Sequence, residues 1–251
     1  MNKEICTNIE NLYCSSIYPD CPKKHLCDNG LHNFSKRPKM PYIGRDYGNN
    51  SKIPNLLFIS LDSGDEYENY HTVEEIRNGV ETNPPRENPG KDKVKHWYQT
   101  FDIATIFINK YLDESVKKGV SYADSFVAHT NSAKCTQNKE KRKIADANLF
   151  ENCRGFVVKE IPLFDADVII TQGNPAKYCL NTYTIIKKID LETIHNGNDI
   201  IFPIYIRETN NKKILHIPMY HPSYFKGYWG QKKAFKDNLD TIYKIVEEIR
   251  N

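Results

Sequence analysis

Asp62, Asn131 and His221 each follow a short apolar run of the sequence. A carboxylate can orient water, a side-chain amide both donates and accepts hydrogen bonds, and an imidazole can stabilise negative charge. Structural alternatives exist, because Asp caps turns, Asn forms them and His can be a satisfied core residue. If the runs are parallel strands, their carboxyl ends meet where open α/β folds bind ligands. The sequence therefore predicts that the three side chains share one site.

The seven cysteines are a second group with chemical potential, and they are unevenly distributed: Cys6, Cys14, Cys21 and Cys27 come first, then Cys135 and Cys153, and Cys179 stands apart. The chain starts without the apolar stretch of a signal peptide, so disulfides are a poor default and metal ligation or catalysis is favoured. A free cysteine can also be a small buried apolar residue, which is the interpretation that we favour for Cys179.

A zinc site at the N-terminal cysteines is one metal hypothesis. Cys14, Cys21, Cys27 and His32 come close to the spacing of a finger with three Cys ligands and one His ligand. This hypothesis leaves Cys135 and Cys153 without a role.

Composition excludes a membrane-spanning chain and indicates no partner. The mean hydropathy is −0.65, and no apolar run approaches the roughly 18–20 residues of a membrane span. The net charge is only +3, which is too small to indicate nucleic-acid binding by itself. We therefore expect a cytoplasmic protein.

Apolar periodicity predicts the elements that position these residues. Helices are expected at about 2–17, 97–112, 150–161, from 175, and at 235–249, and strands at 55–61, 125–130, 166–171, 200–205 and 214–218. Such alternation predicts an α/β fold, a three-layer α/β/α sandwich with a central, mostly parallel sheet. We expect one domain over 1–251, with a Cys-rich N-terminal segment (about 1–50) and a long loop insertion (about 63–95).

Several ordered segments resemble the uracil-DNA glycosylase superfamily, most closely its iron–sulfur, family-four branch. Thr130–Cys135 is similar to the strand end with a base-reading Asn and a cluster Cys. Asn152–Arg154 and then Asp167–Ala176 are similar to the Cys-containing helix, strand and Gly turn that follow. His221–Ser223 is similar to the second catalytic motif, and Asn55–Gly64 lies where the first belongs.

The chain departs from the family pattern in three places. Asp62 stands where the classical uracil-excising enzymes have the Asp of Gly-Gln-Asp-Pro-Tyr, whereas the iron–sulfur branch has Gly-Glu-Ala-Pro-Gly. Five residues separate Cys21 from Cys27, whereas the family has Cys-x-x-Cys. The base-stacking Phe has no clean counterpart, and the candidates to replace it are Trp97, Tyr98, Tyr67 and Tyr70.

The resemblance implies a monomeric glycosylase that removes uracil or another deaminated base flipped out of DNA. It implies catalytic roles for Asp62 and His221. The implied substrate-binding residues are Asn131, Ser63, Gly64, Trp97 and Ser223, and the implied ligands of a four-iron four-sulfur cluster are Cys21, Cys27, Cys135 and Cys153. Replacement of Cys21 or Cys27 by Cys14 or Cys6 stays open.

Two other function classes remain as alternatives. One is a catalytically silent nucleic-acid-binding member of the same fold, and the other is a zinc-finger RNA-binding protein. Four lysines after His221 can grip a phosphate backbone or simply form a solvated helix face: Lys226, Lys232, Lys233 and Lys236.

Overall fold

The computed structural model describes residues 2–17, 21–27, 33–34, 38–61, 72–82, 96–112, 123–135, 137–138 and 145–251. Within these residues the main sheet has seven strands: β2 (Tyr42–Ile43), β4 (Val127–Asn131), β3 (Leu56–Ser60), β6 (Val168–Gln172), β9 (Lys212–Met219), β8 (Asn198–Thr209) and β7 (Thr184–His195), in that spatial order. The four strands from β4 to β9 are parallel, and β2, β8 and β7 are antiparallel to their neighbours. Two short strands, β1 (Asn33–Phe34) and β5 (Gln137–Asn138), pair separately.

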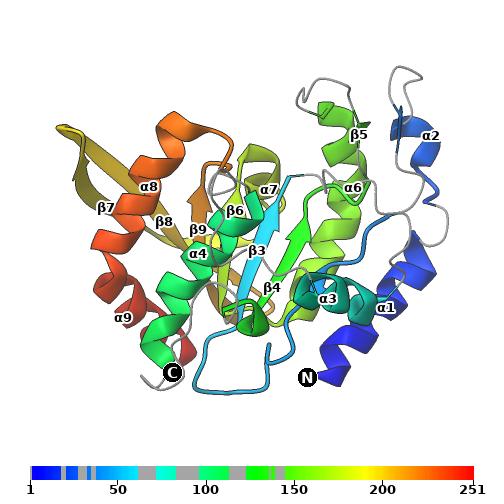
Figure 1. Ribbon diagram of the computed structural model, residues 1–251, viewed down its shortest axis with the longest axis horizontal. Coiled ribbons are helices and arrows are strands. Elements are labelled where there is room, and N and C mark those ends of the chain that lie inside the picture. The colour runs from blue at the N-terminus through cyan, green and yellow to red at the C-terminus, as the bar shows by residue number, and fades with distance from the viewer. Residues whose placement is uncertain are drawn as a thin grey trace.

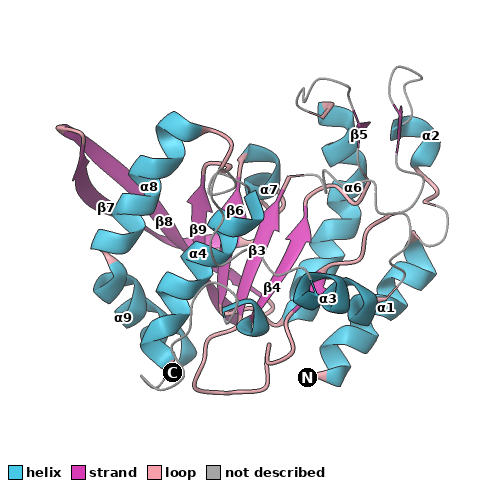
Figure 2. Ribbon diagram, in the orientation of Figure 1, coloured by secondary structure: helices cyan, strands magenta, loops and turns pink. Residues whose placement is uncertain are grey.

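Helices cover both faces of this sheet (Figures 1 and 2). On one side lie α1 (Lys3–Ser16) and α6 (Ala147–Glu160), and on the other lie α4 (His96–Ile108), α8 (Phe225–Asp237) and α9 (Leu239–Arg250). The remaining helical segments are α2 (Lys24–Cys27), α3 (Val73–Thr82), α7 (Asn174–Tyr178), η2 (Asn109–Tyr111), η3 (Asp124–Phe126) and η4 (Ile161–Phe164). The predicted three-layer α/β/α sandwich with parallel central strands is therefore confirmed. Among the described helices, none combines the length and apolarity needed to cross a membrane.

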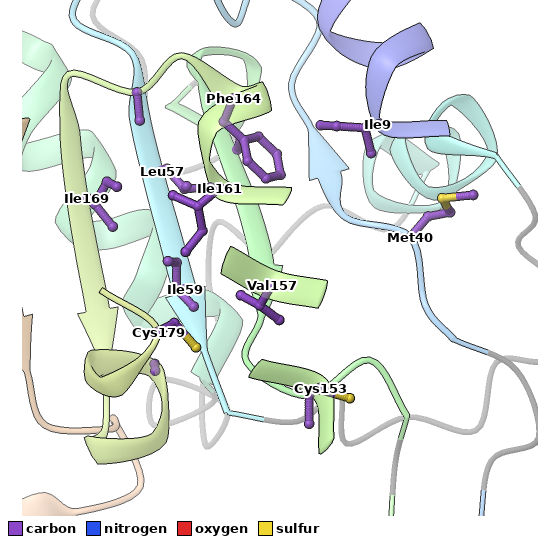
Figure 3. Packing of buried hydrophobic residues seen from close by; sticks show 14 of the residues in the cluster. Ile9, Met40, Leu57, Ile59, Cys153, Val157, Ile161, Phe164, Ile169 and Cys179 are labelled. Carbon is purple, nitrogen blue, oxygen red and sulfur yellow. The ribbon is translucent and has the colours of Figure 1, made fainter. Parts of the chain in front are cut away.

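The central strands are buried on both faces, as expected for parallel strands covered by helices. In β3 the side chains of Leu57 and Ile59 pack toward α1 and α6, whereas those of Leu56 and Phe58 pack toward α4. Figure 3 shows Leu57 and Ile59 in the first of these two cores. Because side chains alternate along a strand, each parallel strand supplies both cores.

Five elements differ from the sequence-based expectation. The strand β7 was not predicted, because its exposed ribbon has adjacent Ile and Lys pairs and a register shift between Ile185 and Lys187, which hide the alternating pattern. The helix α3 lies inside the segment 63–95, which was expected to be a loop. The elements α2, β1 and β2 lie inside the N-terminal segment 1–50, where only the helix at about 2–17 was expected.

The predicted C-terminal helix is two helices, α8 and α9, that meet at Asn238. The backbone of Asn238 is not helical, and its side-chain amide donates to the carbonyl oxygens of Ala234 and Glu192. The Asn238 backbone N–H still donates to the Ala234 carbonyl oxygen, and that of Ile242 donates to the Asn238 carbonyl oxygen, so helical hydrogen bonding continues across this residue.

A buried ion pair joins the first core to the carboxyl end of β4. The Nζ of Lys134 lies 2.5 Å from Oε2 of Glu160, and both side chains are almost fully buried, at 2% and 0% exposed. Glu160 also accepts hydrogen bonds from the hydroxyls of Tyr13, at 2.8 Å, and Thr130. The carboxylate therefore connects α1, β4 and the end of α6.

We predict that Lys134→Met lowers the free energy of unfolding by about 3–5 kcal/mol, because it leaves the Glu160 carboxylate buried without its counter-charge. The double variant Lys134→Met/Glu160→Leu should recover most of that loss. Equilibrium denaturation in urea measures both changes. A double variant no more stable than the single one would show that the ion pair does not act as a unit.

Candidate functional site

The segments that follow β3, β6 and β9 meet at one point at the carboxyl edge of the sheet. Gly173 has a φ of 98°, and a Cβ built on it would lie 2.8 Å from Leu61 Cδ2 and 3.6 Å from His221 Cβ. The Gly173 N–H donates to the carbonyl oxygen of Met219 at 2.8 Å. Glycine is needed here for both its backbone conformation and its size.

Asn131 ends β4 beside this point. It lies opposite Ser60 in the parallel register and is partly buried. The next residue, Ser132, donates its backbone N–H to the Ser60 carbonyl oxygen at 2.8 Å and its hydroxyl to that of Leu61 at 3.2 Å. Asn131 and His221 are therefore placed at the same edge of the sheet, as the sequence predicted. Asp62, Ser63 and Gly64 lie outside the described residues, and their roles stay predictions.

The imidazole of His221 is oriented by Ser223. The Ser223 backbone N–H donates to His221 Nδ1 at 3.3 Å, and the Ser223 hydroxyl lies 2.6 Å from the same nitrogen. Because a backbone N–H only donates, Nδ1 must accept, and a neutral ring then carries its proton on Nε2. The contact that Ser223 makes in the structure is thus with His221, and its predicted contact with substrate stays a prediction.

A histidine that the sequence analysis did not single out stacks on His221. The rings of His96 and His221 have centroids 4.7 Å apart and planes within 4°. The Nε2 of His96 lies 2.8 Å from Oε1 of Gln172 and 2.9 Å from the Ser60 hydroxyl. His129 Nε2 approaches the same hydroxyl at 2.8 Å. The carboxyl edge of the sheet therefore holds a connected polar cluster.

Burial of His129, and partial burial of His96 and His221, keep the three histidines of this cluster neutral. It lowers the pKa of His96 to about 4 and that of His129 well below its usual value. The pKa of His221 is lowered to about 3, first by burial and then by the neighbouring His96. His221 is consequently a neutral hydrogen-bond donor at physiological pH, with no positive charge of its own.

The residues missed in this cluster carried a weak signal in the sequence. Ser60 and Gln172 are polar ends of apolar strands, and His129 is a polar residue within one. Their side chains lie on the inward face, where only a polar partner can satisfy them. His96 had no such signal, because it begins a helix and does not stand at the end of a predicted strand.

Trp97 borders the cluster. Its ring lies 4.5 Å from that of His129 and 5.4 Å from that of Phe101, between centroids, and its side chain is partly buried. The indole therefore forms part of the wall between the polar cluster and the second core. Its predicted stacking on a base stays a prediction.

The cysteines gather on the other face of the sheet. Cys21, Cys135 and Cys153 line one cavity of about 310 Å³, together with Lys134 and Asn152. The Asn152 amide donates to Cys27 Sγ at 3.5 Å, and the Lys134 backbone N–H donates to Cys153 Sγ at 3.5 Å. The structure thus brings the four predicted ligands into one neighbourhood, with Cys153 at the edge of the first core (Figure 3).

These thiols form no disulfide with one another. Burial raises the pKa of Cys153, and the proximity of Cys27 and Cys21 raises it further. All seven cysteines lie in the described part of the chain, and none forms a disulfide there. In that same part, no three His, Cys, Asp or Glu side chains converge closely enough to hold a single metal ion. Cys14 is exposed on α1, and Cys6 is buried against Arg77.

Of the four lysines after His221, Lys232 fits neither the phosphate track nor the solvated helix face, and the side chain of Lys226 is outside the described part of the structure. Lys232 is only 6% exposed, and it forms an ion pair with Asp102 of α4 while donating to Gln99 Oε1. Lys233 pairs with Asp237 one turn along its own helix. The expectation was wrong for Lys232, because α4 offers it a carboxylate in the interior. Lys236 is exposed.

The partly buried His96 predicts a specific pH dependence of stability. Its folded pKa of about 4 lies below the unfolded value of about 6.5, so the unfolded state binds more protons between these values. The contribution of His96 to stability is fully present above pH 6.5 and is lost as the pH drops toward 4. In His96→Gln the slope of the unfolding free energy against pH should be smaller in this range, by the equivalent of about one bound proton. Urea denaturation from pH 7 to pH 4.5 measures the slope, and equal slopes for both proteins would contradict the assignment.

A family model described as the uracil DNA glycosylase superfamily matches residues 87–244, more than half of the chain. The match contains His96, Asn131, Gln172 and His221 of the site, whereas Ser60 lies before the matched residues. A search of curated proteins finds no match to the chain. With the matched segment folded into the α/β/α sandwich that carries this site, the chain belongs to the uracil DNA glycosylase superfamily.

Proposed function

We propose that the protein is a DNA glycosylase that hydrolyses the N-glycosidic bond of uracil or another deaminated base. The observation that carries this proposal is the neutral His221, whose Nδ1 is occupied by Ser223 and whose proton is therefore on Nε2. It stands at the sheet edge that also holds Asn131, in a chain of the uracil DNA glycosylase superfamily.

The chemistry requires stabilisation of a departing base anion. As the glycosidic bond breaks, negative charge develops on the base and positive charge on the sugar. The Nε2–H of His221 is suited to donate to a base carbonyl oxygen, and a neutral donor stays protonated while it does so. The site is already positioned before reaction, so the donation requires no costly rearrangement.

Asn131 is proposed to read the base. Its amide both donates and accepts, and this combination matches the Watson–Crick edge of a pyrimidine. The base must leave the DNA stack to reach it, so the proposed partner is DNA with a flipped nucleotide. A carboxylate that orients water and favours the sugar cation is the role proposed for Asp62.

Incubation with oligonucleotides containing uracil, hypoxanthine or xanthine, followed by alkaline cleavage of abasic sites, tests the proposal. We expect excision of at least one of these bases. His221→Ala should lower the single-turnover rate by about 10²–10³, the usual scale for one positioned donor. Asn131→Ala should instead weaken the choice between uracil and cytosine.

His195→Ala is the matched control, because His195 lies at the end of β7, away from the described site. Its rate should equal that of the wild type. A wild type that binds these oligonucleotides but excises no base would favour the catalytically silent alternative.

We further propose that the cysteine cavity holds a four-iron four-sulfur cluster. The donor set fits, because Cys21, Cys135 and Cys153 line one cavity and Cys27 lies close enough to influence Cys153. Each thiolate of such a cluster binds a different iron, so the sulfurs stand further apart than ligands of one ion. When bound, the cluster supplies a covalent link between the N-terminal segment and the body of the domain.

Metal analysis of anaerobically purified protein should find about four irons per chain, with a brown colour. Cys153→Ser should lose most of the iron, whereas Cys14→Ser should keep it, because Cys14 is exposed on α1 and outside the cavity. A colourless protein with one zinc that is lost in Cys14→Ser and kept in Cys153→Ser would support the zinc finger instead.

A further inference from the structure

Hydrogen bonds at Nε2 hold one edge of the His96 ring, and one face of the ring stacks on His221. The Gln172 Oε1 can only accept, so His96 Nε2 carries the proton that lies between them at 2.8 Å. Gln172 is fully buried, and its Oε1 also accepts from the Ser60 hydroxyl at 2.7 Å. The Thr100 hydroxyl lies 3.1 Å from the same oxygen and 3.0 Å from the His96 carbonyl oxygen, and its one proton can serve either. The acceptor is thereby held by Ser60, and the orientation of the His96 ring follows from it.

The stack with His96 and the contact with Ser223 together orient the His221 ring. With planes within 4° and centroids 4.7 Å apart, the His96 ring covers one face of the His221 ring. Ser223 holds the edge of His221 at Nδ1. A planar ring that is fixed at one edge and against one face has its remaining nitrogen, Nε2, aimed in a single direction.

We propose that His96 is a positioning residue for His221, which fixes the plane of the imidazole that faces the departing base. The expected effect on the excision rate rests on the proposed glycosylase function. The expected effect on the orientation of the His221 ring rests on the stack alone. His96 is not proposed to touch the substrate. It acts through the face of its ring, while its Nε2–H serves to anchor it.

Two substitutions of His96 distinguish the effect of its ring from the effect of its hydrogen bond. His96→Phe keeps a flat ring against His221 but lacks the N–H, and His96→Gln keeps an N–H donor of similar reach but lacks the ring. We expect His96→Gln to lower the single-turnover rate about 10- to 100-fold, as for a displaced catalytic group. We expect His96→Phe to stay within about threefold of the wild type, and both variants to bind abasic DNA as the wild type does.

Nitrogen-15 NMR of the histidines provides a readout that a merely structural role would not change. In the wild type, His221 should show one tautomer, with the proton on Nε2. In His96→Gln the His221 ring can turn away from Ser223, so both ring nitrogens of His221 should report tautomer exchange. In His96→Phe and in the control His195→Ala they should not. Circular dichroism of each variant establishes that it is folded before rates are compared.

The outcomes separate this inference from the function on which it rests. If the wild type excises a base and His96→Gln is as fast, or His96→Phe is as slow as His96→Gln, positioning by the ring is overturned. If the wild type excises no base, the proposed function fails and NMR decides the inference. A single His221 tautomer in His96→Gln would overturn it, and tautomer exchange confined to that variant would support it.

Discussion

The buried Lys134–Glu160 ion pair is the interaction on which the architecture around the carboxyl end of β4 depends. Removing two charges from water is costly unless each finds a partner and further hydrogen bonds. Here Glu160 is completed by the hydroxyls of Tyr13 and Thr130, and Lys134 also contacts Thr130. Because those groups come from α1, β4 and α6, the charges are satisfied only when all three elements are in place. The same residue, Lys134, lines the cysteine cavity and donates its backbone N–H to Cys153. The ion pair therefore also shapes the cavity.

Alternation along the strands separates this ion pair from the histidine cluster. Thr130 points toward α1 and α6, where Glu160 lies, whereas its neighbour His129 points toward α4 and meets Ser60. One short strand, β4, thus serves a charged network on one face and a neutral one on the other. The sheet between them is apolar, so neither network is solvated from behind. This arrangement explains why polar residues occur in pairs of neighbours at the end of an otherwise apolar strand.

The two polar networks use burial in opposite ways. On the face of α1 and α6, burial is tolerated because opposite charges meet. On the face of α4, burial lowers the pKa values of the histidines, and the cluster avoids charge altogether. A neutral imidazole can donate a hydrogen bond to the oxygen of an anionic leaving group and keep its proton, because its N–H is a very weak acid. Electrostatic environment, more than residue type, gives His221 its proposed role.

The apolar runs of the sequence determined the central strands, and the rule that parallel strands end at one edge placed Asn131 at the same edge of the sheet as His221. The positions of Cys135 and Cys153 were likewise predictable, because Cys135 follows a predicted strand and Cys153 lies on the next predicted helix. Only the tertiary structure decided the stack of His96 on His221, since no periodicity links residues so distant in the chain. It also turned Lys232 inward, because the partner that makes this favourable, Asp102, lies on a helix far away in the sequence. Local patterns report which side of an element is buried, whereas the identity of a buried polar partner depends on which elements pack together.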